Sequence, residues 1–282
     1  MVSQLHLRAS AFGEPVRPVL SRSVGSVHSV FTRAFNVVVE GALVAVAPAS
    51  AGRLPNGIAL TEAPNFRALG LRVGDRVELA PTRVSLPRTG LVIDLRRAEP
   101  WDASLRVVGR APDAERVRRF AALLPETGLG SPEADPWRAW SAVANLREGL
   151  AAGDVTRSAS AAADLIGRGP GLTPAGDDLL VGCSAALTAA GHPGARSFAR
   201  GAADAAQGRT SAVAETCHQH AARGEYGEHL HVVLAALAGE PTGGPAAADA
   251  ELVSAVRRAL AWGATSGADA LLGVLVGLEA SR

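Results

Sequence analysis

Residues 26–48 read SVHSVFTRAFNVVVEGALVAVAP, and they decide the fold of the N-terminal part of the chain. Val, Phe and Thr dominate this stretch, and β-branched and aromatic side chains favour strands. The second apolar run begins directly after Glu40 and Gly41. Such a short polar break between apolar runs is typical of a hairpin turn. The stretch therefore predicts antiparallel strands joined by a tight turn at Glu40 and Gly41.

Strand signals continue beyond this hairpin. LRVGDRVEL at 71–79 and TGLVIDL at 89–95 alternate apolar with polar residues between Pro and Gly breaks. We expect roughly six to eight short strands over residues 5–105. Many short strands in so small a segment predict a small β-barrel or sandwich.

The spacing of the apolar residues changes after residue 110. DAERVRRFAALL at 113–124 and PWRAWSAVANLREGLAAG at 136–153 place them three and four positions apart, which is the spacing of an amphipathic helix. Short Gly- and Pro-containing breaks separate further segments of this kind, and predict roughly eight or nine packed helices. The predicted fold is therefore α+β, with a β-rich domain at residues 1–108 and an all-helical domain at residues 109–282.

Composition argues against several classes of protein. A net charge of +1 does not fit a dedicated nucleic-acid binder. A membrane-spanning helix needs a run of about 18 uncharged apolar residues, and the sequence contains no such run. The N-terminus lacks the apolar core of a signal peptide. Cys183 and Cys217 lie in apolar, helix-like segments and suggest buried thiols in a cytoplasmic protein.

The chain contains no lysine, because all 28 basic residues are arginine. This excludes a Schiff-base lysine and a P-loop, both of which need the amine. Any bound anion must be held by arginine, by backbone N–H groups or by a metal.

The segment GRGPGLTPAGDDLLVG at residues 167–182 combines glycines, prolines and two aspartates. Thr173 can cap a helix that begins near Pro174. Three glycines permit a left-handed backbone or the close approach of a ligand; they are Gly169, Gly171 and Gly176. A helix start explains the threonine, the proline and one aspartate, but not the glycines or the second aspartate.

Asp177 and Asp178 leave three interpretations open. A plain helix start places acidic residues in the first turn. A substrate site would combine them with the N–H groups of the loop. A metal site would use them as ligands, and Mg²⁺ would then be the cofactor. The cofactor is therefore undetermined, with Mg²⁺ or none as the candidates.

The pattern G-x-D-x-L-x-G occurs twice. In GATSGADALLGVLVGL at residues 263–278, Asp269 stands 91 positions after Asp178. The glycine four residues after each aspartate lies one helical turn on, where it lets a helix or ligand come close. Because both helix starts carry the same pattern of glycine and aspartate, we expect them to face one another across one cleft.

GRTSAVAE at residues 208–215 lies between the two repeats. Arg209 is a candidate anion clamp, because its guanidinium can bond bidentately; Thr210 is a candidate ligand contact or a helix cap. Glu215 and His218 have the i, i+3 spacing of a metal-ligand pair, but no second pair accompanies them. Three further histidines are expected at the surface or as caps: His220, His229 and His231.

These patterns give the following candidates. The candidate catalytic residues, which are also the candidate metal ligands, are Asp177, Asp178 and Asp269. The candidate substrate-binding residues are Gly169, Gly171, Thr173, Gly176, Arg209, Thr210, Thr265, Ser266 and Gly267.

The combination of GRGPGLTPAGDDLLVG, GRTSAVAE and GATSGADALLGVLVGL resembles the AllH-type family. VHSVFTRAFNVVV, LPNGIAL and LVIDLRRAEPWD in the N-terminal part are similar to that family as well. The family includes a subunit of oxamate carbamoyltransferase, which interconverts oxalurate plus phosphate with oxamate plus carbamoyl phosphate in allantoin breakdown. The resemblance implies a cytoplasmic enzyme subunit that acts with other subunits on a small anion or amide. Arg209 and Thr210 match only half of the S-x-R-T phosphate loop of common carbamoyltransferases.

Two other functions remain open. Acidic residues at helix starts also resemble the di-magnesium ADP-ribosylglycohydrolases, which suggests a Mg²⁺- or Mn²⁺-dependent hydrolase. A structural or regulatory subunit is the other alternative; Thr173, Asp178 and Asp269 would then be helix caps. Neither the composition nor the motifs suggest a nucleic-acid or membrane partner.

Overall fold

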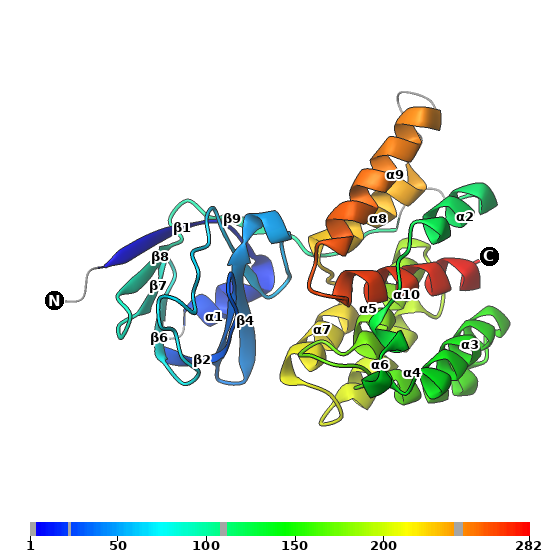
Figure 1. The fold of residues 1–282 in the computed structure, drawn as a ribbon, viewed down its shortest axis with the longest axis horizontal. Helices are drawn as coiled ribbons and strands as arrows, with labels where there is room; N and C mark the ends of the chain where they lie inside the picture. The colour runs from blue at the N-terminus through cyan, green and yellow to red at the C-terminus, as the bar shows by residue number, and fades with distance from the viewer. Residues whose placement is uncertain (1–3, 22–23, 108–111, 240–244) are drawn as a thin grey trace. The chain divides into compact units, whose positions relative to one another are not determined.

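The computed structural model describes residues 4–21, 24–107, 112–239 and 245–282 (Figure 1). The chain divides into two compact units, Met1–Ala103 and Ser104–Arg282. The predicted boundary between residues 108 and 109 lies outside the described residues. The first unit is built mainly of strands and the second of helices, so the predicted α+β class is confirmed.

The first unit is a closed β-barrel, which decides between the two predicted β architectures. The strands are β1 (Leu5–Gly13), β2 (Val24–Val30), β3 (Phe35–Val39), β4 (Ala42–Pro48), β5 (Gly57–Leu60), β6 (Arg76–Ala80), β7 (Arg83–Leu86), β8 (Leu91–Asp94) and β9 (Glu99–Trp101). Eight of them follow the order β5-β4-β3-β2-β6-β7-β8-β1, and β1 pairs with β5 to close the barrel. The ninth, β9, pairs with the end of β1 at Ala11–Gly13.

The quoted hairpin forms as predicted. Val39 pairs with Ala42 across the turn, and Glu40 and Gly41 have φ values of 49° and 83°. A two-residue turn with both φ values positive matches the twist of the strands that it joins.

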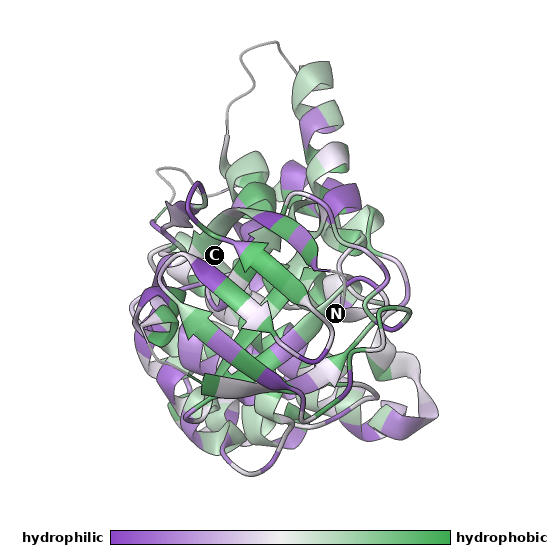
Figure 2. Ribbon diagram, turned by 90° about the vertical axis from the view of Figure 1, so that its left-hand side faces the viewer, coloured by the Kyte–Doolittle hydropathy of each residue, from purple (hydrophilic) through white to green (hydrophobic). Residues whose placement is uncertain are grey.

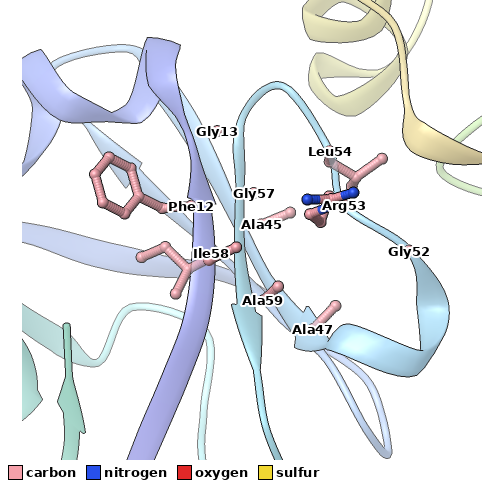
Figure 3. A pocket seen from close by; sticks show the side chains of 11 residues that line it. Phe12, Gly13, Ala45, Ala47, Gly52, Arg53, Leu54, Gly57, Ile58 and Ala59 are labelled. Atoms are coloured by element: carbon pink, nitrogen blue, oxygen red, sulfur yellow. The ribbon is translucent and has the colours of Figure 1, made fainter. Parts of the chain in front are cut away.

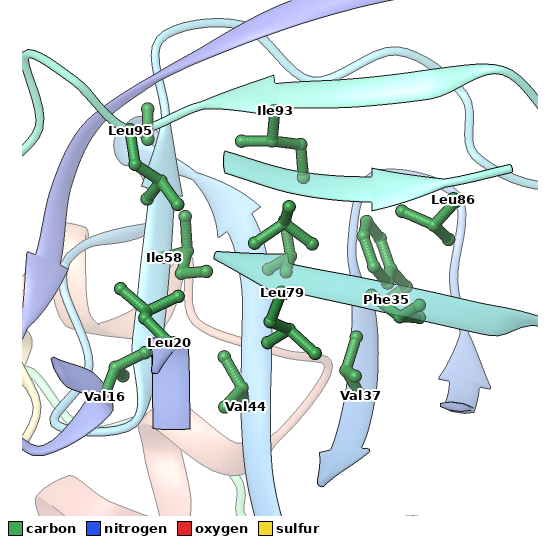
Figure 4. Close-up of a cluster of buried hydrophobic side chains, with 14 of the residues drawn as sticks. Val16, Leu20, Phe35, Val37, Val44, Ile58, Leu79, Leu86, Ile93 and Leu95 are labelled. Carbon is green, nitrogen blue, oxygen red and sulfur yellow. The ribbon is translucent and has the colours of Figure 1, made fainter. Parts of the chain in front are cut away.

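The barrel has its own hydrophobic core. Phe35 and Phe66 are fully buried and meet edge to face, with ring centroids 4.9 Å apart. Figure 4 shows aliphatic side chains such as Leu79 and Ile93 in the same cluster. Hydrophobic and hydrophilic residues alternate along several strands (Figure 2), as expected where one face of a strand points into a core. The short helix α1 (Arg17–Leu20) adds Leu20 to this core.

The described residues of the second unit form nine α-helices. They are α2 (Ala114–Ala122), α3 (Pro136–Ala152), α4 (Val155–Leu165), α5 (Ala175–Ala189), α6 (Ala195–Ala206), α7 (Ala212–Ala222), α8 (Glu228–Ala238), α9 (Pro245–Leu260) and α10 (Ser266–Ala280). The hydrophobic residues form two clusters, and α5 and α10 contribute to both. None of the described helices is long and apolar enough to cross a membrane.

Helices α5 and α10 touch backbone to backbone, because glycines stand where they cross. A Cβ at Gly182 would lie 1.9 Å from the carbonyl oxygen of Ala270, and one at Gly273 would lie 1.9 Å from that of Leu179. Both distances are far inside van der Waals contact, so no larger residue fits. The glycine four residues after each aspartate thus has the packing role expected from the sequence.

The two helices run in the same direction. Gly273 lies against Leu179, and Gly277 lies against Cys183, so the contact advances by four residues along both helices. The pair also has an approximate local two-fold symmetry, since residue 182 meets 270 as residue 273 meets 179, at the same 91-residue offset. The first turns of α5 and α10 therefore lie at the same end of the pair.

Candidate functional site

The loop before α5 owes its shape to its glycines. Gly167, Gly169 and Gly171 have φ values of 74°, 102° and 96°, which side-chain-bearing residues rarely adopt. A Cβ at Gly176 would lie 1.9 Å from the carbonyl oxygen of Leu165. Backbone conformation and packing thus explain these glycines before any ligand is considered.

Gly267 has the equivalent role at the start of α10. A Cβ there would lie 2.1 Å from the carbonyl oxygen of Ala259, at the end of α9. Each repeat therefore packs the first turn of its helix closely against the end of another helix.

Thr173 does not cap α5, contrary to the sequence-based prediction. The helix begins at Ala175, its N-cap is Pro174, and no side chain caps it. Pro174 is extended, with ψ of 146°, so Thr173 lies one residue too early to cap. Its hydroxyl instead hydrogen-bonds to the hydroxyl of Ser266 across 2.8 Å, which joins the two helix starts.

Asp177 uses both carboxyl oxygens to hold neighbouring segments. Oδ1 lies 2.9 Å from Nε2 of His218. Oδ2 accepts hydrogen bonds from the N–H of Gly167 and the hydroxyl of Thr210, both at 2.9 Å. The side chain is buried, with 1% of its residue surface exposed. Asp177 therefore ties the glycine loop to α7, and its oxygens are already engaged.

Asp178 has a free oxygen next to the second repeat. Its Oδ2 is closed off from solvent and has no hydrogen-bond partner among the described residues. Burial raises the pKa of this carboxyl well above its usual range. Hydrogen bonds from Ser266 and Thr173 oppose the rise, and the negative charges of Asp269 and Asp177 add to it.

Asp269 mirrors this arrangement from α10. It is fully buried, and its Oδ1 accepts a 2.7 Å hydrogen bond from the N–H of Gly128. Its Oδ2 lacks a partner among the described residues, as Oδ2 of Asp178 does. Burial raises the pKa of Asp269, while hydrogen bonds from Thr265 and Gly128 oppose the rise.

The starts of the two repeats therefore lie together, joined by the hydrogen bond between Thr173 and Ser266. Asp178 and Asp269 interact electrostatically, and both lie in the first turns of parallel helices. The positive ends of two helix dipoles favour negative charge there, whereas burial of two carboxyls disfavours it. Neither aspartate is the N-cap of its helix, so the capping role considered in the sequence does not explain them.

Both parts of the chain match models of one protein family. A family model described as oxamate carbamoyltransferase subunit AllH matches residues 165–278, and a model of the AllH family N-terminal domain matches residues 8–100. The chain belongs to the AllH family. No curated protein and no solved structure matches it. The AllH match includes the glycine loop, α7 and both aspartate-bearing helix starts, and the family description as a subunit implies further subunits.

Arg209 and Thr210 lie beside the glycine loop in this AllH chain. The guanidinium of Arg209 donates a 2.8 Å hydrogen bond to the carbonyl oxygen of Ala163 and is otherwise exposed. Thr210 is engaged with Asp177. The next residue, Ser211, caps α7 by accepting a hydrogen bond from Ala214, and its hydroxyl also donates to the carbonyl of Leu172. These contacts fix the loop against α7.

Glu215 and His218, which have the spacing of a metal-ligand pair, are each bonded to other groups. Glu215 accepts a 2.6 Å hydrogen bond from the N–H of Gly208, and His218 is bonded to Asp177. Nowhere in the described ranges do three His, Cys, Asp or Glu side chains come together in a group that could hold a metal ion.

Two of the three remaining histidines are less exposed than expected. His220 is 6% exposed, and its Nδ1 lies 2.6 Å from Glu225. His229 stacks on Trp262 with ring centroids 5.3 Å apart, and burial lowers its pKa to about 4. His231 is partly exposed. The rings pack among the apolar residues of α7 and α8. The position of each histidine in the sequence does not show this packing.

The cysteines of the AllH chain are not activated. Both thiols are free. Burial, with the charges of Asp178 and Asp177, raises the pKa of Cys217 to about 12, and burial raises that of Cys183 further. A thiol of such high pKa stays protonated at neutral pH and is a poor nucleophile.

Sequence reasoning missed two participants at this site. His218 was weighed only as a metal ligand, yet it holds Asp177. Gly128, in the 3₁₀ turn Gly128–Gly130, was not considered, because it lies 141 residues before the aspartate to which it donates. No local motif signals such a contact.

A separate hollow lies in the barrel unit (Figure 3). Its lining is mostly backbone and small apolar side chains, and the residues are Ala11, Phe12, Gly13, Ala45, Ala47, Gly52, Arg53, Leu54, Gly57, Ile58 and Ala59. The guanidinium of Arg53 lies 5.3 Å from the ring centroid of Trp101. None of the predicted site residues lines this hollow.

Proposed function

We propose that this AllH chain supplies the site at which a carbamoyl group is transferred between a small amide and phosphate. In this proposal oxalurate and phosphate are interconverted with oxamate and carbamoyl phosphate, or a related ureido acid takes the place of oxalurate. The chain acts in the cytoplasm in a complex with other carbamoyltransferase subunits. The family assignment and the two free thiols support this setting.

The observation that carries the proposal is the pair of unpartnered carboxyl oxygens, Oδ2 of Asp178 and Oδ2 of Asp269. Buried polar atoms are almost always hydrogen-bonded, because an unpaired one costs free energy. Two unpartnered acceptors on carboxyls that interact electrostatically complement a ligand that carries N–H groups. Amides and ureido acids carry such groups, whereas phosphate alone does not.

The raised pKa of Asp178 suits a general base. In the direction of oxalurate synthesis, the amide nitrogen of oxamate attacks the carbamoyl carbon of carbamoyl phosphate. A C–N bond forms, the C–O bond to phosphate breaks, and phosphate leaves with the electron pair. The nitrogen loses a proton, which Asp178 accepts. A carboxylate of raised pKa binds that proton more tightly than an ordinary one.

The remaining candidates have supporting roles in this proposal. The hydroxyls of Thr173 and Ser266 lie at the joined helix starts, where a donor could stabilise a developing oxyanion. We assign the phosphate to the N–H groups of Gly169 and Gly171 and to the exposed guanidinium of Arg209. Asp177 and Thr210 position the loop and do not react.

The test is a steady-state assay of the chain co-purified with its partner subunits, using oxalurate and phosphate as substrates. We expect Asp178→Asn and Asp269→Asn each to lower kcat by about a hundredfold, the usual size of an acid–base contribution. Asp204→Asn is the matched control, because Asp204 is an exposed aspartate on α6. Full activity in both site variants, or a complex inactive on every ureido acid tried, would overturn the proposal.

A further inference from the structure

The turn at residues 127–131 lies against the site although it is outside both family-matched ranges. Gly128 donates its N–H to Asp269. A Cβ at Gly128 would lie 2.9 Å from Oγ1 of Thr265, 3.0 Å from Cβ of Ala175 and 3.1 Å from Oδ2 of Asp269. The turn is thus wedged between the starts of α5 and α10, beside the unpartnered oxygen of Asp269.

Two hydroxyls of this turn are also unsatisfied. Oγ1 of Thr127 and Oγ of Ser131 are closed off from solvent and have no hydrogen-bond partner among the described residues. The turn itself is well formed, since Gly130 and Ser131 donate their N–H groups to the carbonyls of Thr127 and Gly128. Its backbone therefore does not explain why two buried hydroxyls lack partners.

We propose that this turn is a third wall of the site, and that Thr127 and Ser131 bind the oxygen atoms of the substrate. The inference rests on the proposed function and names its substrate class. The hydroxyls supply donors, while Asp178 and Asp269 supply acceptors. A small carboxylic amide has both donors and acceptors. Its N–H groups can donate to the carboxyls, and its carboxylate or carbonyl oxygens can accept from the hydroxyls. The turn then selects the acid half of the substrate, and phosphate binds elsewhere.

The test compares Thr127→Val and Ser131→Ala with wild type in the assembled complex. We expect each variant to raise KM for oxamate about tenfold or more, the usual effect of losing a hydrogen bond to a charged group. KM for carbamoyl phosphate should stay within about twofold, since its phosphate does not touch the turn. Ser141→Ala is the control, because Ser141 is exposed on α3 and bonds only locally, to the carbonyl of Trp137.

Thermal melting of the full chain alone gives an independent readout. Without ligand, Thr127→Val should melt at the same temperature as wild type or higher, because the change removes an unpaired buried hydroxyl. Added oxamate should raise the melting temperature of wild type but not of Thr127→Val or Ser131→Ala. Variants whose free form melts several degrees lower would show that the hydroxyls have internal partners, which would overturn the inference.

The two proposals fail separately. An unchanged KM for oxamate in both variants, with an active complex, would overturn this inference and leave the proposed function standing. An inactive complex, together with an oxamate-induced melting shift that the variants abolish, would overturn the proposed function and leave this inference standing. The absence of both activity and shift in wild type would overturn both.

Discussion

At the scale of single residues, the three aspartates of the two repeats differ in what their oxygens do. Asp177 is fully engaged with His218, Gly167 and Thr210. Asp178 and Asp269 each keep one oxygen that no other described residue hydrogen-bonds. Of two adjacent aspartates, Asp177 thus holds neighbouring segments with both oxygens, whereas Asp178 leaves Oδ2 without a hydrogen-bond partner among the described residues.

Asp269 should make the free protein less stable as the pH rises. Its pKa is raised above the usual 3.8 in the folded state, so the unfolded chain ionises first. Stability is then full below about pH 3.8 and falls as the pH rises through the folded pKa. Asp269→Asn keeps the acceptor for Gly128 and removes this dependence.

We therefore expect Asp269→Asn to be more stable than wild type at pH 8. Urea unfolding at about pH 3.5 and pH 8 measures the difference, which should be larger at pH 8, where Asp269 is ionised in the unfolded chain. The same stability difference at both values would contradict the raised pKa.

His218→Ala should destabilise the helical unit. The change leaves Oδ1 of Asp177 buried without its partner, at a cost of about 3 kcal/mol. Chemical unfolding measures the loss, and proteolysis within residues 167–174 should become faster because the loop depends on Asp177. His6→Ala is the control, since His6 is exposed on β1; an equal effect of both changes would argue against the role of Asp177.

At the scale of elements, the glycines that join α5 to α10 set the geometry of the site. Their sequence pattern predicted the close approach, because glycine one turn after each aspartate leaves one helix face open. The parallel direction and the local two-fold became visible only in the contacts. The turn at residues 127–131 could not be predicted, because nothing in its sequence points to a partner so far along the chain.

Gly182→Ala and Gly273→Ala should each destabilise the protein strongly. The new methyl group would lie 1.9 Å from a carbonyl oxygen of the partner helix, so the helices must separate, at a cost of about 3 kcal/mol or more. Gly201→Ala is the matched control, because Gly201 lies in α6 with open space around its Cβ position. That change should stabilise by up to about 1 kcal/mol, since alanine is the better helix former. Thermal unfolding distinguishes the two outcomes, a lower melting temperature for Gly182→Ala and Gly273→Ala and an equal or higher one for Gly201→Ala.

At the scale of the whole molecule, the two units have separate hydrophobic cores. The sequence predicted both classes of unit, since the apolar period differs between them. It left barrel and sandwich undecided, because barrel closure depends on the pairing of β1 with β5, some fifty residues apart. That pairing follows from three-dimensional geometry and has no local signal.

A core change in the barrel should therefore leave the helical site intact. Phe35→Ala removes a fully buried ring that packs against Phe66, at a cost of about 3–5 kcal/mol. Hydrogen exchange should accelerate across β2, β3 and β4 and stay unchanged across α5 and α10. Equal acceleration in both units would show that they unfold together.

The local two-fold between α5 and α10 has a consequence for how a ligand is oriented. A ligand that lies on the two-fold axis meets Asp178 and Asp269 in nearly equivalent positions, so it could bind either way round with similar contacts. The surroundings break this ambiguity, because Asp269 accepts a hydrogen bond from the N–H of Gly128, whereas Asp178 lies beside the hydroxyls of Ser266 and Thr173. If the proposed substrate binds here, its orientation is therefore set by these neighbours and not by the aspartates themselves.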